Sequence, residues 1–77
     1  MGRSEFNYEI VERISTLSKN GDTTKELNRV SYNGAPPKYD IRQWRRSEEG
    51  GEKMLKGVTL TAEEFEALKD AIAKLPH

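Results

Sequence analysis

Cysteine is absent from this 77-residue chain, and the only histidine is the last residue, His77. Missing thiols exclude disulfides, and without thiolates or an internal imidazole the chain lacks the usual ligands of zinc. No apolar run approaches the roughly 18 residues of a transmembrane helix, and MGRSEFNYEI lacks the apolar core of a signal peptide. We therefore expect an intracellular protein, in the cytoplasm or nucleoid if its source is bacterial, with no metal, cofactor or membrane association.

Catalytic groups are equally scarce. No glycine-rich phosphate loop precedes a helix. Glu48 and Glu49 adjoin in a polar turn, where carboxylates are ordinarily solvated. The sequence predicts no enzyme and no catalytic residue.

Net charge is zero, but the charges are unevenly distributed. Residues 13–56 hold ten basic and six acidic side chains, whereas residues 61–77 hold two basic and four acidic ones. This distribution predicts a basic surface on one part of the molecule despite overall neutrality.

Four segments have the composition of β-strands, and turn signals separate them. Asn20-Gly21 and Asn33-Gly34 accept the positive φ angles of tight turns, and Pro36-Pro37 exclude a central strand at that point. The polar stretch SEEGGE forms the third turn. The expected strands cover residues 7–18, 25–33, 38–46 and 53–60.

The last part of the chain changes to helical periodicity. Thr61 followed by Glu64 makes a capping box, and Pro76 ends the segment, so a helix is expected over residues 62–75. Its apolar face comprises Phe65, Leu68, Ile72 and Leu75. The prediction is a single α+β domain over residues 1–77, a four-stranded antiparallel curved sheet in meander order followed by a C-terminal helix that covers one face, β-β-β-β-α.

The third strand, KYDIRQWRR, places the only tryptophan among cations. Side chains alternate across a strand, so Arg42, Trp44 and Arg46 share one face. Ile41 points toward the helix, which predicts that Trp44 lies on the open face, away from it. The same reasoning puts Tyr32 with Val30 on the core side of the second strand. It also makes Val58 and Leu60 core residues.

An aromatic side chain ringed by Arg and Lys suits single-stranded nucleic acid, because bases stack on the ring and cations attract the phosphates. A strand tryptophan is also common in a core or a dimer interface, where arginine covers it. Two alternatives stay open: a protein-interaction module that uses the face of Trp44 and Arg42, and binding of single-stranded RNA in place of DNA.

Several short motifs in order resemble a known family. Asp40-Ile41-Arg42 with Trp44, the acidic glycine turn 49–53, KGVTL (56–60) and the capped helix are similar to the single-stranded-DNA-binding transcriptional positive coactivators, the p15 family. TKELN (24–28), VSYNG (30–34) and PPKYDIR (36–42) further resemble its small bacterial, YdbC-like branch. The similarity covers about residues 7–75.

The resemblance implies a homodimer that binds single-stranded DNA. Because stacking ignores base identity, we expect little sequence preference. The expected role is transcription regulation or DNA maintenance, and the transcription machinery is one candidate partner. The short chain also needs additional burial, which a second copy would supply. The expected dimer contacts are Phe65, Leu68, Ile72 and Leu75. The expected nucleic-acid contacts, from motif match or from charge and position, are Lys25, Arg29, Tyr32, Lys38, Arg42, Trp44, Arg46, Lys53 and Lys56.

Overall fold

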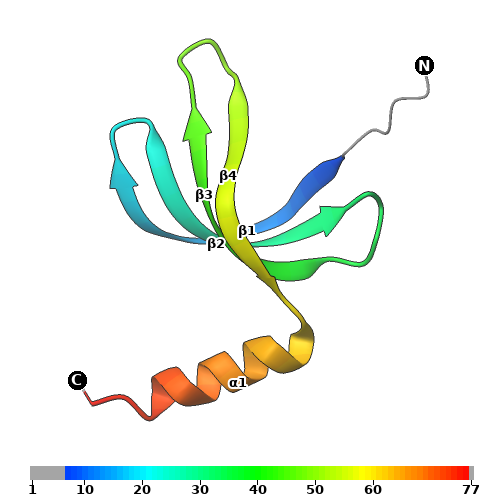
Figure 1. The fold of residues 1–77 in the computed structure, drawn as a ribbon, viewed down its shortest axis with the longest axis vertical. Helices are drawn as coiled ribbons and strands as arrows, with labels where there is room; N and C mark the ends of the chain where they lie inside the picture. The colour runs from blue at the N-terminus through cyan, green and yellow to red at the C-terminus, as the bar shows by residue number, and fades with distance from the viewer. Residues whose placement is uncertain (1–6, 77) are drawn as a thin grey trace.

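The fold class predicted from the sequence is confirmed. The computed structural model describes residues 7–76, and within them neighbouring strands pair antiparallel in the order β1-β2-β3-β4 (Figure 1). No helix in this range is long and apolar enough to cross a membrane. The elements are β1 (Tyr8–Asn20), β2 (Thr23–Tyr32), β3 (Lys38–Arg46), β4 (Glu52–Leu60) and α1 (Ala62–Ala73).

The first two turns use the residues whose backbone they require. Asn20 pairs with Thr23, which leaves a two-residue loop whose first member, Gly21, has φ +65°, as a type II′ turn demands. Asn33 (φ 52°) and Gly34 (φ 78°) are both left-handed, the pattern of a type I′ turn. The expected turns at both positions are confirmed.

The sheet curls so strongly that its opposite corners meet. Tyr8 pairs with Tyr32 at one end of the sheet, whereas Glu52 pairs with Arg46 at the other end. In a flat sheet β1 and β4 would also lie about 14 Å apart. Nevertheless the Tyr8 hydroxyl donates to Glu52 Oε1 over 2.8 Å. This contact identifies the face of Tyr8 and Glu52 as the inside of the curl, which we call the inner face.

Bulges in the edge strand β1 explain much of this curvature. The register of β1 against β2 shifts at three places, which leaves Val11, Ile14 and Leu17 without a partner residue. Each bulge adds a residue to one strand only and increases the local twist. The three unpaired side chains are all exposed on the edge strand. The imperfect alternation of the β1 sequence is therefore a sign of bulges.

The core inside the curl is small and partly polar. Val30 and Trp44 are its buried apolar residues. Glu26, Asn28 and Asp40 are buried beside them. The register places all five on the inner face, because Asn28 lies opposite Asp40 and Thr24 opposite Trp44.

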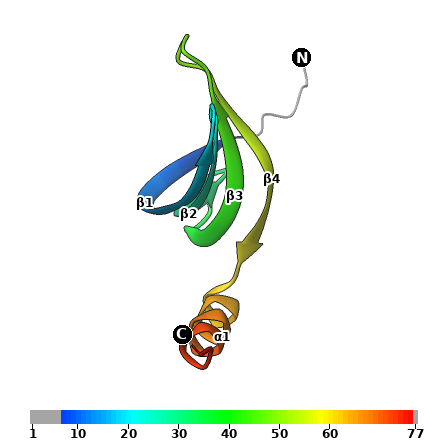
Figure 2. The ribbon, with the colours of Figure 1, turned by 90° about the vertical axis from the view of Figure 1, so that its left-hand side faces the viewer.

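The helix begins as predicted but does not cover the sheet. Thr61 Oγ1 accepts from the Glu64 amide over 3.0 Å, and Glu64 Oε1 accepts from the Thr61 amide over 2.9 Å. A single residue, Thr61, separates β4 from α1, and no loop returns the helix over the middle of the sheet. The helix therefore lies beyond the end of the sheet (Figures 1 and 2). Its main anchor is Phe65, whose ring stacks on Tyr39 with centroids 3.7 Å apart.

Position 57 needs a glycine because a neighbouring residue on β3 leaves no room for a side chain. The backbone angles of Gly57 do not themselves require glycine. It lies opposite Arg42 in the register. A Cβ at this position would stand 2.5 Å from Arg42 Cβ and 2.6 Å from Arg42 Cα. The stem of Arg42 thus runs directly over the glycine, and a side chain at position 57 would collide with it.

We predict that Gly57→Ala destabilises the protein by roughly 1–3 kcal/mol, the usual range for overpacking. The matched control is Gly51→Ala, whose added Cβ would meet only the rotatable Ser47 Oγ, at 3.1 Å. The free energy of unfolding of Gly51→Ala should stay within about 0.5 kcal/mol of the wild-type value. Urea unfolding followed by circular dichroism measures both, and equal midpoints for the two variants would contradict the close approach.

Candidate nucleic-acid interface

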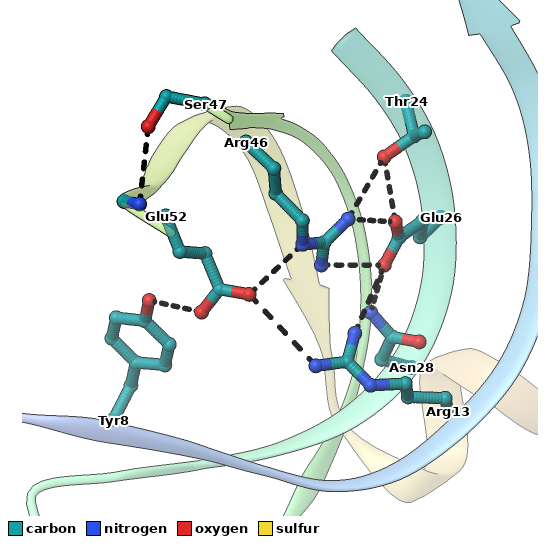
Figure 3. A network of polar contacts seen from close by, with 9 residues as sticks. Tyr8, Arg13, Thr24, Glu26, Asn28, Arg46, Ser47 and Glu52 are labelled. Carbon is teal, nitrogen blue, oxygen red and sulfur yellow. Dashed lines mark hydrogen bonds and ion pairs between the residues drawn. The ribbon is translucent and has the colours of Figure 1, made fainter. Parts of the chain in front are cut away.

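Arg46 links three strands on the inner face (Figure 3). From β3 its Nη1 donates to Glu26 Oε2 on β2 over 2.7 Å, and its Nε donates to Glu52 Oε2 on β4 over 3.0 Å. Thr24 and Asn28 also donate to the Glu26 carboxylate, over 2.6 Å and 3.0 Å. The buried charge of Glu26 is thus fully hydrogen-bonded, which is what burial of a carboxylate requires.

The edge strand β1 joins this network through two side chains. The guanidinium of Arg13 lies 3.7 Å from Glu26 and 3.8 Å from Glu52, and the Tyr8 hydroxyl donates to Glu52. Figure 3 shows both side chains reaching from β1 toward Glu52. Glu52 is therefore the residue at which the two edges of the curled sheet are tied together.

These contacts shift the pKa values of the groups involved. Hydrogen bonds, above all from Arg46, lower the pKa of Glu26 from 4.5 to about 2. The hydrogen bond from Tyr8, followed by that from Arg46, lowers the pKa of Glu52. Burial, with the Glu52 contact, raises the pKa of Tyr8. At neutral pH the network therefore holds ionised carboxylates and a neutral phenol.

A second cluster forms around the DIR motif. Arg42 makes two parallel bonds to Asp40, Nε to Oδ1 and Nη2 to Oδ2, each 3.0 Å long. Its Nη1 donates to the Leu55 carbonyl over 2.9 Å. Tyr32 and Thr59 hydroxyls donate to the same carboxylate, over 2.6 Å and 2.8 Å. Chiefly because of the bonds to Asp40, the pKa of Arg42 is raised. Only 14% of the Arg42 side chain is exposed, so this pair supports the sheet.

The position expected for Trp44 is half right. It lies on the face opposite the helix, together with Arg42 and Arg46, but it is 0% exposed, so the expectation of an open stacking surface is wrong. The Tyr8 ring covers it with centroids 5.4 Å apart, and the Arg46 guanidinium lies 5.7 Å from its ring centre. The cause is the curl, which folds the inner face onto its own edge strand.

One polar atom of Trp44 is not satisfied by the protein. Its Nε1 is buried and has no hydrogen-bond acceptor within residues 7–76. An unmade hydrogen bond at a buried donor costs about 1–3 kcal/mol, and such groups are rare in folded proteins.

The remaining predicted residues fall on two faces. Tyr32 was expected on the helix side. It lies instead on the inner face, 3.3 Å from Arg42 Nη2, because Val30 also faces inward. Lys38 follows the same face at the start of β3, opposite Val30. Arg29 lies on the outer face, beside the ring of Tyr39 at 5.8 Å.

The outer face carries three lysines from the predicted set. Lys53 lies opposite Arg45, and Lys25 lies opposite Gln43. Lys25 and Lys56 line an open groove floored by β3 and Gly57. None of these lysines has a carboxylate within ion-pair distance in the part of the chain that the structure describes. The nine predicted residues thus do not form one continuous site.

Four polar residues of the inner face were not predicted from the sequence: Tyr8, Arg13, Glu26 and Glu52. Their common feature is the network around Arg46. No motif marks them, and the bulge at Val11, between Tyr8 and Arg13, hides the fact that both side chains face inward. Only the curl brings β1 close to Glu52.

A comparison with protein families matches residues 19–71 to the family described as transcriptional coactivator p15 (PC4). The match covers most of the chain. The protein belongs to the p15 (PC4) family. The resemblance noted in the sequence is therefore confirmed.

This chain is also similar to a curated protein. An uncharacterized protein of Treponema pallidum (strain Nichols) is 45% identical over 69 residues, which span 88% of this chain and 78% of the relative. The p15 match begins after Tyr8 and Arg13, so it contains Arg42, Trp44 and Arg46 but neither of the β1 residues that cover them.

The depressed pKa of Glu26 predicts acid sensitivity. Because the folded-state pKa lies below the ordinary value of 4.5, at about 2, the stabilisation is complete above the ordinary value and is lost as the pH falls toward 2. The loss should reach roughly 3 kcal/mol. The free energy of unfolding, measured by urea titration between pH 7 and pH 2, checks this.

Glu26→Gln should remove most of this pH dependence and lower stability at pH 7 by roughly 2–3 kcal/mol, because Arg46 loses a buried partner. The control is Glu12→Gln, which removes an exposed ion pair with Arg29 and should cost less than about 1 kcal/mol at pH 7. An unchanged acid slope in Glu26→Gln would show that other groups cause the sensitivity.

Proposed function

We propose that this protein binds single-stranded DNA with little sequence preference, as a homodimer, and serves transcription regulation or DNA maintenance. One observation carries the proposal beyond family membership. Two aromatic and two guanidinium side chains of the predicted set share the inner face: Tyr32, Arg42, Trp44 and Arg46.

The chemistry of this face suits an unpaired strand. Aromatic rings stack on bases of any identity, and each stacked base contributes about 1–3 kcal/mol. Arg46 keeps a third of its side chain exposed, and Lys38 is exposed near Tyr32. A duplex keeps its bases stacked inside the double helix, so it could contact only the basic side chains of this face.

The outer lysines give a second path for phosphates. Lys25 and Lys56 flank an open groove. Neither has a carboxylate within ion-pair distance in the described range, so no ion pair has to break before they bind an anion. The inner face offers stacking groups in addition, and we therefore place the bases there.

Titration of the protein with labelled oligo-dT, duplex DNA and oligo-U at several salt concentrations tests this function. Oligo-dT should bind more tightly than duplex, and its affinity should fall as salt rises because counterions are released. Lys38→Ala on the inner face should weaken binding a few-fold and reduce the salt slope by about one. Lys25→Ala on the outer face is the comparison, and it should weaken binding less than Lys38→Ala.

A larger loss in Lys25→Ala than in Lys38→Ala would move the site to the outer groove. Equal affinity for duplex and single strand would contradict the function itself. Tighter binding of oligo-U than of oligo-dT would assign the site to RNA.

The homodimer is supported by apolar surface that one chain leaves uncovered. None of the α1 residues is buried in the described structure, and Ile72 and Leu75 are 54% and 59% exposed. Val58, expected in the core, is half exposed on the outer face opposite Ile41. A helix attached at one end, with an apolar row in water, gains most from packing on a second copy.

We predict that the protein has the mass of a dimer by light scattering at micromolar concentration. Ile72→Lys should weaken dimerisation at least tenfold, because it places a charge in the apolar row. Asp70→Lys, which puts the same side chain on the opposite side of α1, should not. A monomeric wild type would refute the dimer, and circular dichroism verifies that both variants keep their helix.

A further inference from the structure

The most enclosed aromatic side chain of the inner face, Trp44, is covered by a ring that reaches across the curl. Trp44 is covered on one side by Tyr8, and Tyr8 is held to the far edge of the sheet by its hydroxyl bond to Glu52. Arg13 adds two longer ion pairs, of 3.7 Å and 3.8 Å. We call Tyr8, Arg13 and Glu52 the clasp.

We propose that the clasp is a cover that a bound single strand replaces: phosphate takes the guanidinium of Arg13, and a base takes the place of the Tyr8 ring on Trp44. This inference rests on the proposed function. It adds Tyr8 and Arg13, which precede the residues matched to the family, to the nucleic-acid site.

The strand that carries the cover is a bulged edge strand. Three bulges interrupt the pairing of β1 with β2, at Val11, Ile14 and Leu17. Each interruption removes ladder contacts. As an edge strand, β1 has a neighbour on one side only. Its first residues can therefore move away from β4 while β2, β3 and β4 remain paired.

The cover also leaves Trp44 imperfectly satisfied. The indole N–H finds no acceptor within residues 7–76, and the Tyr8 ring meets it tilted at 52°. A nucleotide offers both a flat ring and acceptor oxygens and nitrogens. Replacing Tyr8 by a base would give the indole a stacking partner and bring acceptors near its N–H.

Arg13 is the cation best placed to change partners. It is 59% exposed, whereas Arg42 is mostly covered and doubly bonded to Asp40. Arg46 would keep its short contact with Glu26 after Arg13 leaves, so the network survives the exchange.

Tyr8→Phe tests the cover, because it keeps the ring and removes the bond to Glu52. The single tryptophan of the chain reports directly on Trp44. In the free variant, acrylamide should quench Trp44 emission more strongly than in the wild type. In this variant the hydrogen bond to the charged Glu52 no longer holds the ring of residue 8 over Trp44. The affinity for oligo-dT should therefore rise by up to about tenfold. Glu52→Gln should act in the same direction.

Matched controls lie on the outer face. Tyr39→Phe removes a hydroxyl from a ring stacked on Phe65 and should change neither quenching nor affinity. Arg13→Ala should reduce the salt slope of oligo-dT binding by about one. Arg45→Ala, which removes an exposed guanidinium 4.0 Å from Asp22, should not.

Saturating oligo-dT should quench Trp44 emission in the wild type, while anisotropy of a labelled oligonucleotide reports binding independently. Binding by anisotropy with unchanged Trp44 emission would overturn the clasp and leave the proposed function intact. Absence of binding in both measurements, at low salt, would overturn the function and the clasp together. Equal affinity and equal acrylamide quenching in Tyr8→Phe and wild type would also overturn the clasp.

Discussion

The bridge that Arg46 makes between Glu26 and Glu52 holds the curled sheet of this protein together. A sheet of four strands with a short helix at its end has little apolar material to hold a curl. Here the curl is held by charged groups, which reach across it because carboxylates on β2 and β4 face the same guanidinium on β3. The polar network therefore stands where a larger domain would place apolar side chains.

Buried ion pairs are a costly way to hold a fold, because well-packed apolar groups of similar size stabilise as well or better. Their use here is consistent with a surface that must exchange partners. An apolar core cannot release a group to a phosphate, whereas an arginine held by a carboxylate can. Under the proposed function, the inner face serves both as the core of a monomer and as a set of cations whose anions are exchanged on binding.

Much of the architecture could be predicted from local sequence. The capping box at Thr61, the turn at Asn33-Gly34 and the order of the elements follow from short-range rules, and the structure confirms them. Alternation also grouped Arg42, Trp44 and Arg46 correctly. These features depend on backbone preferences within a few residues, which a single sequence contains.

The environment of Trp44 could not be predicted by the same rules. Alternation tells which residues share a face but not whether that face is flat or closed on itself. The closure depends on the bulges of β1, where two residues oppose one and the alternation is lost. The error for Tyr32 has a related origin: an apolar residue such as Val30 suggests the helix side, but the buried residues within 7–76 lie inside the curl.

The two faces hold their cations in different ways, although the net charge of the chain is zero. On the inner face Arg42 and Arg46 are already neutralised by Asp40, Glu26 and Glu52, so a strand that binds there exchanges one anion for another. On the outer face Lys25 and Lys56 have no carboxylate within ion-pair distance among residues 7–76. The number of counterions released on binding should therefore match the number of lysines and loosely held arginines that a strand contacts. It should be smaller than the total number of basic residues in contact with the strand. Specificity for single strands would then come from stacking on the inner face, because stacking alone distinguishes an unpaired base from a duplex.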